Sequence, residues 1–315
     1  MRGNHPPPFS YILRRDGRMK KRMKKKLKDT IISYLFCFPA YSVFAVFIFI
    51  PIVWAFVLSF TDYSLLTFGE SKFVGFDNYI RLFKDPVFLK SLLNTLYYSV
   101  LYVPATLIIG FLFALMLNDD FPGRNFFRLA MFIPVIISMV VASIVWMLIL
   151  SAHPTSLANR FLALFGIPPQ GWLSDPKLAM ISVAVVMVWK TFGYKMLLYL
   201  AAMQNIPQEL YEAAEIDGAT GWKKTMYITI PLLKPTTFFL LVTSVIDSFQ
   251  IFTPIYIMTG GGPGYATTTI VNYLYQKGFQ EFEMGYASAI SYILFLILLV
   301  LTFIQKKGFG KEELY

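Results

Sequence analysis

Residues 91–117 read SLLNTLYYSVLYVPATLIIGFLFALML and contain no charged side chain. A helix needs about 20 predominantly apolar residues to cross the ~30 Å hydrocarbon core of a bilayer. The apolar side chains of this stretch surround the helix, whereas a surface helix of a soluble bundle carries one apolar stripe. We therefore predict that residues 91–117 cross a membrane.

The composition extends this prediction to the whole chain. Hydrophobic residues make up 57% of the 315 residues and charged residues only 15%, against roughly 25% charged residues in a typical soluble domain. We predict an all-α membrane protein with a membrane domain at residues 31–307, preceded by a basic, disordered tail at 1–30 and followed by a short tail at 308–315. The predicted transmembrane helices are residues 31–60, 91–117, 129–150, 178–203, 236–258 and 284–304.

The distribution of basic residues predicts the orientation. Eleven of the 28 Lys and Arg residues lie in the first thirty positions, directly before the first apolar run. Such a block is a cytosolic orientation signal and attracts anionic lipid headgroups, so the net charge of +10 does not indicate nucleic-acid binding. With both termini cytosolic, nineteen basic residues fall on the cytosolic side and seven outside. The polar segment 204–234 is then a cytosolic loop.

This loop carries the most informative motif of the chain. Residues 208–219 read QELYEAAEIDGA, in which Tyr211, Ala214 and Ile216 give a modest apolar face. Gly218 permits a sharp reversal, and a second helix then continues to Pro231. On physics alone this is an amphipathic hairpin at the membrane interface.

Glu212-Ala213-Ala214, followed by Gly218, Ile228 and Pro231 at their spacing in this loop, resembles the EAA loop of the membrane subunits of bacterial ABC importers. The resemblance implies the type I importer permease fold, with cytosolic coupling helices that seat on an ATPase subunit. It assigns ATPase coupling to Glu212, Ala213, Ala214, Asp217, Gly218, Ile228 and Pro231.

Further segments resemble the sugar-importer branch, which contains the maltose-type permeases, in its short six-span form. These segments are Asn94-Thr95, Leu117-Asn118, Phe121–Arg124, Phe132-Ile133-Pro134, Tyr256–Pro263 and Gly285–Ala289. The resemblance implies a multi-pass protein of a bacterial plasma or inner membrane, with a second permease, two ATPase subunits that bind Mg-ATP, and an extracytoplasmic sugar-binding protein as partners. The chain itself is expected to hold no cofactor, metal or catalytic residue.

Polar and aromatic side chains within the spans are the candidates for substrate contact, because an unpaired polar group costs energy in lipid. Ser244, Asp247 and Gln250 follow one another at three-residue spacing, with Phe249 and Phe252 beside them. Either Asp247 and Gln250 contact substrate, or they bond neighbouring helices or a partner permease.

Two lysines lie in the fourth predicted span, and more than one role is open for them. Lys190 or Lys195 could face an acidic sugar, pair with Asp247, or extend to the cytosolic edge. We take Lys190 as the candidate for the substrate pathway.

Three other functions remain to be weighed. An ion-coupled secondary transporter would show inverted repeats, and none is evident. A membrane enzyme with a His-based site is disfavoured because His5 and His153 are the only histidines. An ABC permease for another solute, such as glycerol phosphate, a peptide or an ion, would carry the same EAA loop, so only the sugar-branch residues argue against it.

Overall fold

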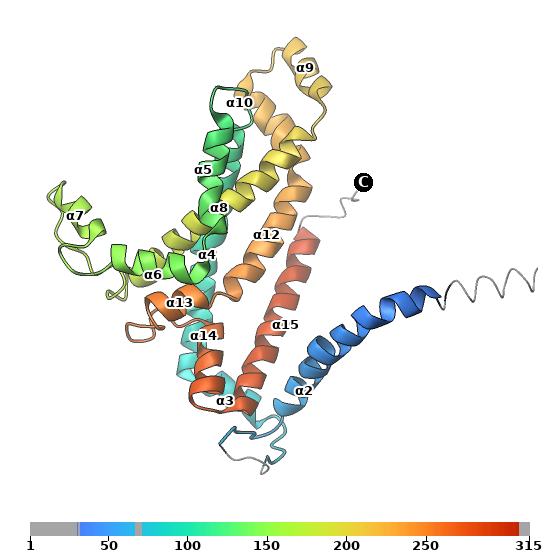
Figure 1. Cartoon of the computed structure of the whole chain (residues 1–315), viewed down its shortest axis with the longest axis vertical. Coiled ribbons are helices and arrows are strands. Elements are labelled where there is room, and N and C mark those ends of the chain that lie inside the picture. The colour runs from blue at the N-terminus through green and yellow to red at the C-terminus, as the bar shows by residue number, and fades with distance from the viewer. Residues whose placement is uncertain (1–29, 31, 67–70, 309–315) are drawn as a thin grey trace, which may run out of the picture. The chain divides into compact units, whose positions relative to one another are not determined.

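The computed structural model describes residues 30, 32–66 and 71–308. The chain divides into two units, residues 1–57 and residues 58–315. Figure 1 shows the ribbon of the whole chain. The predicted basic tail, apart from Thr30, and the predicted C-terminal tail, apart from Gly308, lie outside the described residues.

The described part of the first unit is an apolar helix, Ile32–Leu58, whose last residue belongs to the second unit. It contains a π-helical turn at Ala45–Phe49 (η1), in which the Ile50 N–H donates to the Ala45 carbonyl, followed by α2 (Ile50–Leu58). Pro51 comes directly after this turn and has no N–H to offer the Phe47 carbonyl, which accounts for the local widening of the helix.

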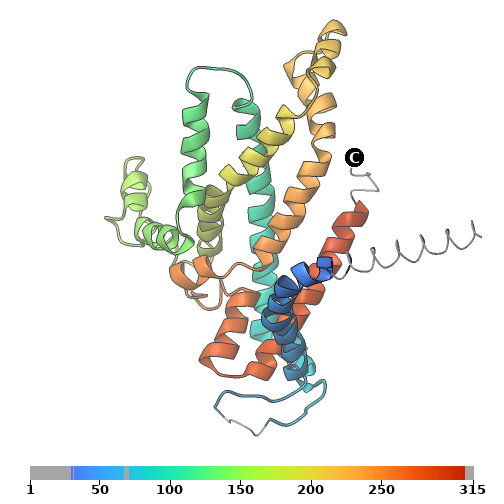
Figure 2. The same cartoon turned by 45° about the vertical axis from the view of Figure 1, so that its right-hand side comes forward.

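The second unit consists of helices joined by turns and by longer loops, the longest of which precede α3, α8 and α14. Its elements are α3 (Asp77–Lys84), α4 (Pro86–Met116), α5 (Arg124–Ile136), α6 (Met139–Ile149), α7 (Leu157–Ala163), α8 (Ala179–Gln204), α9 (Gln208–Ile216), α10 (Gly221–Lys224), η2 (Thr225–Thr229), α11 (Ile230–Leu232), α12 (Lys234–Phe249), α13 (Thr253–Met258), α14 (Ile270–Tyr275), η3 (Gln276–Gln280) and α15 (Met284–Gly308). Within this unit, Figures 1 and 2 place α9 and α10 at one end and α3 at the other.

Helix α4 is the centre of the second unit. Asp85 is its N-cap residue. The Asp85 carboxylate accepts hydrogen bonds from the backbone N–H groups of Val87 and Phe88 at 2.9 and 3.3 Å, as a capping side chain does. The helix packs most extensively against α8. Gly110 lies at the crossing, where an added Cβ would come 2.9 Å from Lys195 Cβ. Small residues at such positions let membrane helices approach closely.

The third predicted span, residues 129–150, is not a single straight helix. Helices α5 and α6 meet at 96° across Ile137 and Ser138, whose ψ angles of 138° are extended rather than helical. Pro134 lies one turn before this bend and removes one backbone donor from the helix. The pair is either one broken span or a re-entrant segment.

The fifth predicted span, residues 236–258, is also interrupted. Helix α12 ends at Phe249 and α13 begins at Thr253. Pro254 has no N–H for the Gln250 carbonyl. The next carbonyl along the chain, that of Ile251, accepts from the Thr269 hydroxyl at 3.1 Å. The break therefore leaves polar backbone at mid-span.

Five helices of the described chain are long and apolar enough to cross a membrane, and the α5–α6 pair makes six if it counts as one span. The predicted all-helical membrane architecture is confirmed.

Candidate functional site

The loop between α8 and α12 folds as a helical hairpin closed at Gly218. Gly218 has φ +78°, and its N–H donates to the Glu215 carbonyl at 3.0 Å while the Ala219 N–H donates to the Ala214 carbonyl at 2.8 Å. This pair of bonds ends α9 in a Schellman motif, for which glycine is the usual residue. The predicted reversal at Gly218 thus has a specific backbone form.

Two side-chain contacts hold the hairpin together. The hydroxyls of Tyr211 and Thr229 are 3.0 Å apart, and Lys224 forms an ion pair with Glu215. Beneath them lies a groove of about 620 Å³ that Gln204, Gln208 and residues of the α4–α5 turn line in part. The hairpin is therefore a folded element attached to the ends of α4 and α8.

The outward surface of the hairpin combines polar and apolar groups. Most of the residues that the sequence assigned to ATPase coupling are exposed: Glu212, Ala213, Asp217, Gly218 and Pro231. Ala214 and Ile228 are half-buried.

Three apolar side chains of this surface are exposed as well. Ile216, which the sequence placed on a modest apolar face with Tyr211 and Ala214, is 88% exposed, and Trp222 and Tyr227 are 66% and 80% exposed. Large exposed apolar side chains are typical of surfaces that contact another protein or lipid. An aromatic residue in an otherwise polar loop was the only sequence signal for Trp222.

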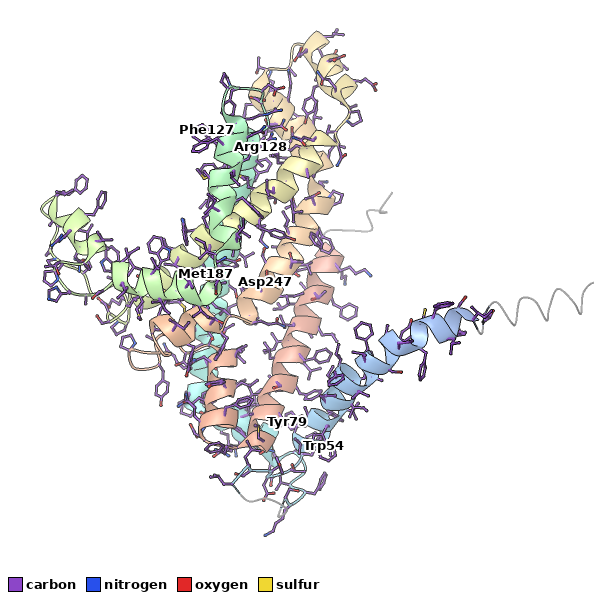
Figure 3. All side chains as sticks on the ribbon, viewed as in Figure 1. Trp54, Tyr79, Phe127, Arg128, Met187 and Asp247 are labelled. Carbon is purple, nitrogen blue, oxygen red and sulfur yellow. The ribbon has the colours of Figure 1, made fainter. Side chains whose placement is uncertain are left out.

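A second candidate site lies where the fifth span is broken. A cavity of about 320 Å³ is bounded by the end of α12, the start of α13, α4 and α8. Figure 3 shows Met187 and Asp247 together there, between the two ends of the unit. Its lining residues are Tyr98, Tyr102, Met139, Met187, Thr191, Asp247, Gln250, Ile251, Phe252, Thr253 and Pro254.

The polar groups of this cavity are positioned by neighbouring helices. Asp247 lies 3.8 Å from the ammonium of Lys195, and its side chain remains 62% exposed while that of Lys195 is 3% exposed. Tyr98 and Tyr102 stack with ring centroids 5.4 Å apart, and the Tyr102 hydroxyl lies 3.0 Å from that of Thr191. The wall thus combines aromatic faces, a hydroxyl pair and one carboxylate, which are groups suited to a polar solute.

The structure separates the predicted substrate residues into two sets. Asp247, Gln250 and Phe252 line the cavity. Ser244 and Phe249 are buried in the packing of the unit, at 0% and 3% exposure. Three-residue spacing drifts by about 60° per step on a helix of 3.6 residues per turn, so Ser244 turns away from Gln250.

Lys190 has a structural contact. It is 6% exposed, and its ammonium donates to the Val135 carbonyl at 2.9 Å. That carbonyl lies in the last turn of α5, where the chain bends and where backbone carbonyls have no N–H partner within the helix. Lys190 therefore stabilises the α5–α6 bend and does not line the cavity.

A third polar cluster ties α4 to α14 and α15 at the end of the unit opposite the hairpin. The Asp85 carboxylate accepts from the hydroxyls of Tyr273 and Tyr286. Burial raises the pKa of Asp85, but these two hydroxyls and the N–H groups of Phe88 and Val87 outweigh burial, and the net effect lowers its pKa below the ordinary value of 3.8. Burial, followed by the bond to Asp85, raises the pKa of Tyr273.

These observations define a helical membrane protein with a polar cavity at an interrupted span and an exposed helical hairpin at one end. Residues 87–307 match the family described as binding-protein-dependent transport system inner membrane component. The chain belongs to this family.

Curated relatives align along almost the whole chain. The arabinooligosaccharides transport system permease protein AraP of Bacillus subtilis is 39% identical over 279 residues, covering 88% of each chain. The lactose transport system permease protein LacF of Rhizobium radiobacter is 37% identical over 280 residues, covering 87% of this chain and 92% of LacF.

A solved structure shares the fold. A bacterial ABC transporter involved in the import of the acidic polysaccharide alginate matches with a TM-score of 0.81 and 26% identity, covering 91% of this chain and 98% of that one. The expected type I importer permease fold is thereby confirmed.

Proposed function

We propose that this chain is the membrane-spanning subunit of a binding-protein-dependent ABC importer and forms half of the translocation pathway for a sugar or oligosaccharide. The observation that carries the proposal is the cavity at the break of the fifth span. Asp247 and Gln250 offer hydrogen bonds there, and Phe252 offers an aromatic face. The relatives named for arabinooligosaccharides and lactose transport support a sugar as the solute.

The proposed partners follow from two exposed surfaces. Asp247 stays 62% exposed in the isolated chain, which suits a pathway whose other wall is a second, similar permease. The hairpin surface around Glu212, Ile216 and Trp222 suits a groove of an ATPase subunit, of which the importer would hold two. A solved structure of the alginate transporter contains an alginate pentasaccharide-bound periplasmic protein, which supports an extracytoplasmic binding protein as the donor of the sugar.

In this proposal the chain performs no chemistry. Mg-ATP is bound and hydrolysed by the partner ATPase subunits, and the hairpin, including Ala213, Gly218 and Pro231, transmits their closure to α8 and α12. These helices then rock between two packed arrangements. The chain resides in a bacterial plasma or inner membrane with both termini cytosolic.

The test is ATPase activity of the assembled complex in lipid nanodiscs, measured over a panel of glycans with the binding protein present. We expect at least one glycan to stimulate hydrolysis, and Asp247→Asn to lower the stimulation. Asp77→Asn, an exposed carboxylate of α3, serves as the matched control and should leave it unchanged. Stimulation by an amino acid or a metal ion, and by no glycan, would contradict the sugar assignment.

A further inference from the structure

A second cavity lies beside the cavity at the break of the fifth span, on the side away from the hairpin. We call the cavity at the break the mid-span cavity and the second one the outer cavity. The outer cavity occupies about 280 Å³ between the glycine turn after α13 and the α14–η3 segment. Its side-chain wall consists of three tyrosines, three amides and one threonine: Tyr256, Tyr265, Thr268, Asn272, Tyr275, Gln276 and Gln280. Among the described residues that line it, none is charged.

A row of aromatic rings connects this outer cavity to the mid-span cavity. Phe252, which lines the mid-span cavity, stacks on Tyr256 with ring centroids 5.3 Å apart. Tyr256 lies 5.3 Å from Tyr275, and Tyr275 stacks on Phe279 at 5.4 Å. Tyr256 and Tyr275 both line the outer cavity, so the two cavities share one continuous aromatic wall.

Asn272 contributes an amide to the outer cavity. The residue is 6% exposed, and it lines the cavity together with Gly261. Its Oδ1 approaches Gly261 so closely that an added Cβ would lie 2.7 Å away. Glycine at position 261 therefore leaves room for an amide that can both donate and accept hydrogen bonds with a ligand in the cavity.

We propose that the outer cavity is a subsite for one neutral sugar unit of an oligosaccharide whose next unit lies against Phe252, Asp247 and Gln250. The proposal rests on the proposed function and adds the substrate class. Aromatic faces accept the C–H faces of a pyranose or furanose, and amides exchange hydrogen bonds with its hydroxyls.

The charges of these two cavities disfavour an acidic sugar. Among the described residues that line either cavity, Asp247 is the only one with a charged side chain, and its nearby cation, Lys195, is 3% exposed. A uronate would therefore meet a carboxylate of like charge and no accessible cation. This distinguishes the chain from its structural relative, which imports the acidic polysaccharide alginate.

The test compares glycans of different length in proteoliposomes that hold the complete complex, with maltose, lactose, arabinotriose and maltotriose as probes. Tyr256→Leu and Gln280→Leu remove a ring and an exposed amide of the outer cavity. We expect each to lower kcat/KM for the transported trisaccharide about tenfold, the loss that truncation of a binding hot spot of ~1.4 kcal/mol gives. Tyr256→Phe, which keeps the ring, should stay within about threefold of the unmodified complex.

Phe165→Leu is the matched control, because Phe165 is an exposed aromatic residue beyond α7 that lines neither cavity. Basal ATPase activity and the elution volume of the complex report whether each variant has assembled. Trisaccharide uptake that Tyr256→Leu and Gln280→Leu leave unchanged would overturn the subsite alone. An unmodified complex that takes up no glycan would overturn the proposed function and the subsite with it. Uptake of an alginate trisaccharide at the rate of the neutral glycan would overturn the neutral assignment.

Discussion

Substitution of Gly193 by alanine should strongly destabilise the packing of α8 against α5 in the second unit. Gly193 lies where α8 crosses α5, and an added Cβ would come 2.2 Å from the Met131 carbonyl oxygen and 3.2 Å from Phe132 Cα. Carbon–oxygen contacts in proteins lie near 3.3 Å or beyond, so α5 would have to withdraw by about 1 Å. Because both neighbours are backbone atoms, no change of rotamer relieves the clash.

The magnitude follows from this geometry. Overpacking costs about 1–3 kcal/mol when side chains can adjust, and a clash with backbone places Gly193→Ala at or above the upper end. The displacement also reaches the bend of the third span, since Lys190 on α8 donates to Val135 on α5. We therefore expect loss of both thermal stability and transport.

The assay is thermal unfolding of the detergent-solubilised protein, followed by size-exclusion chromatography with fluorescence detection. Two alanine substitutions set the scale. At Gly110 the nearest atom to an added Cβ is Lys195 Cβ at 2.9 Å, and at Gly221 nothing lies within 4 Å. The midpoint should fall most for Gly193→Ala, less for Gly110→Ala, and not measurably for Gly221→Ala. A Gly193→Ala protein that unfolds at the midpoint of the unmodified protein would refute the reasoning.

Three further predictions concern the hairpin, the bend and the cluster opposite the hairpin. Gly218→Val should uncouple glycan-stimulated ATPase activity from uptake in the assembled complex, because the left-handed conformation costs a residue with a side chain about 1–2 kcal/mol. Gly218→Asn should retain coupling. Normal coupling in the valine variant would contradict the role of the turn. Lys190→Met should lower the unfolding midpoint by leaving the Val135 carbonyl unpaired, at about 1–3 kcal/mol, and should slow uptake of every glycan equally; an effect confined to an acidic glycan would instead indicate substrate contact. Asp85→Asn should lower the midpoint at neutral pH. Since the pKa of Asp85 is lowered by folding, its stabilisation is present above pH 3.8 and lost as the pH falls through the lower folded value; a midpoint with the same pH dependence in both proteins would argue against this.

The membrane architecture could be predicted because hydropathy is a property of consecutive residues. The interruptions could not, since proline has no single outcome within a span. Pro104 lies inside the continuous helix α4, whereas Pro134 precedes a bend of 96° and Pro254 follows a break. At both interruptions a side chain distant in sequence donates to a backbone carbonyl, Lys190 to Val135 and Thr269 to Ile251. Such contacts depend on the tertiary structure and cannot be predicted from the proline alone.

The candidate sites were accessible from sequence to different degrees. The hairpin turn depends on one glycine and its immediate neighbours, so local reasoning located it at Gly218. The cavity depends on which side of α12 faces α4 and α8. Spacing alone grouped Ser244 with Asp247, but the two side chains lie about 60° apart around the helix, and Ser244 is buried. The outer cavity joins residues of α13 and α14 across a glycine turn, and no helical periodicity extends across such a turn.

The central claim is that this chain moves a sugar inward at the expense of ATP hydrolysed on the side of its hairpin. The most direct measurement is uptake of labelled maltotriose, arabinotriose or lactose by proteoliposomes that hold the complete complex, with the binding protein outside. Our account predicts accumulation of at least one of these glycans only when Mg-ATP is present on the side of the Gly218 hairpin, opposite the binding protein. Uptake that an ion gradient drives without ATP, or no uptake of any glycan by a complex whose ATPase responds to another solute, would contradict it.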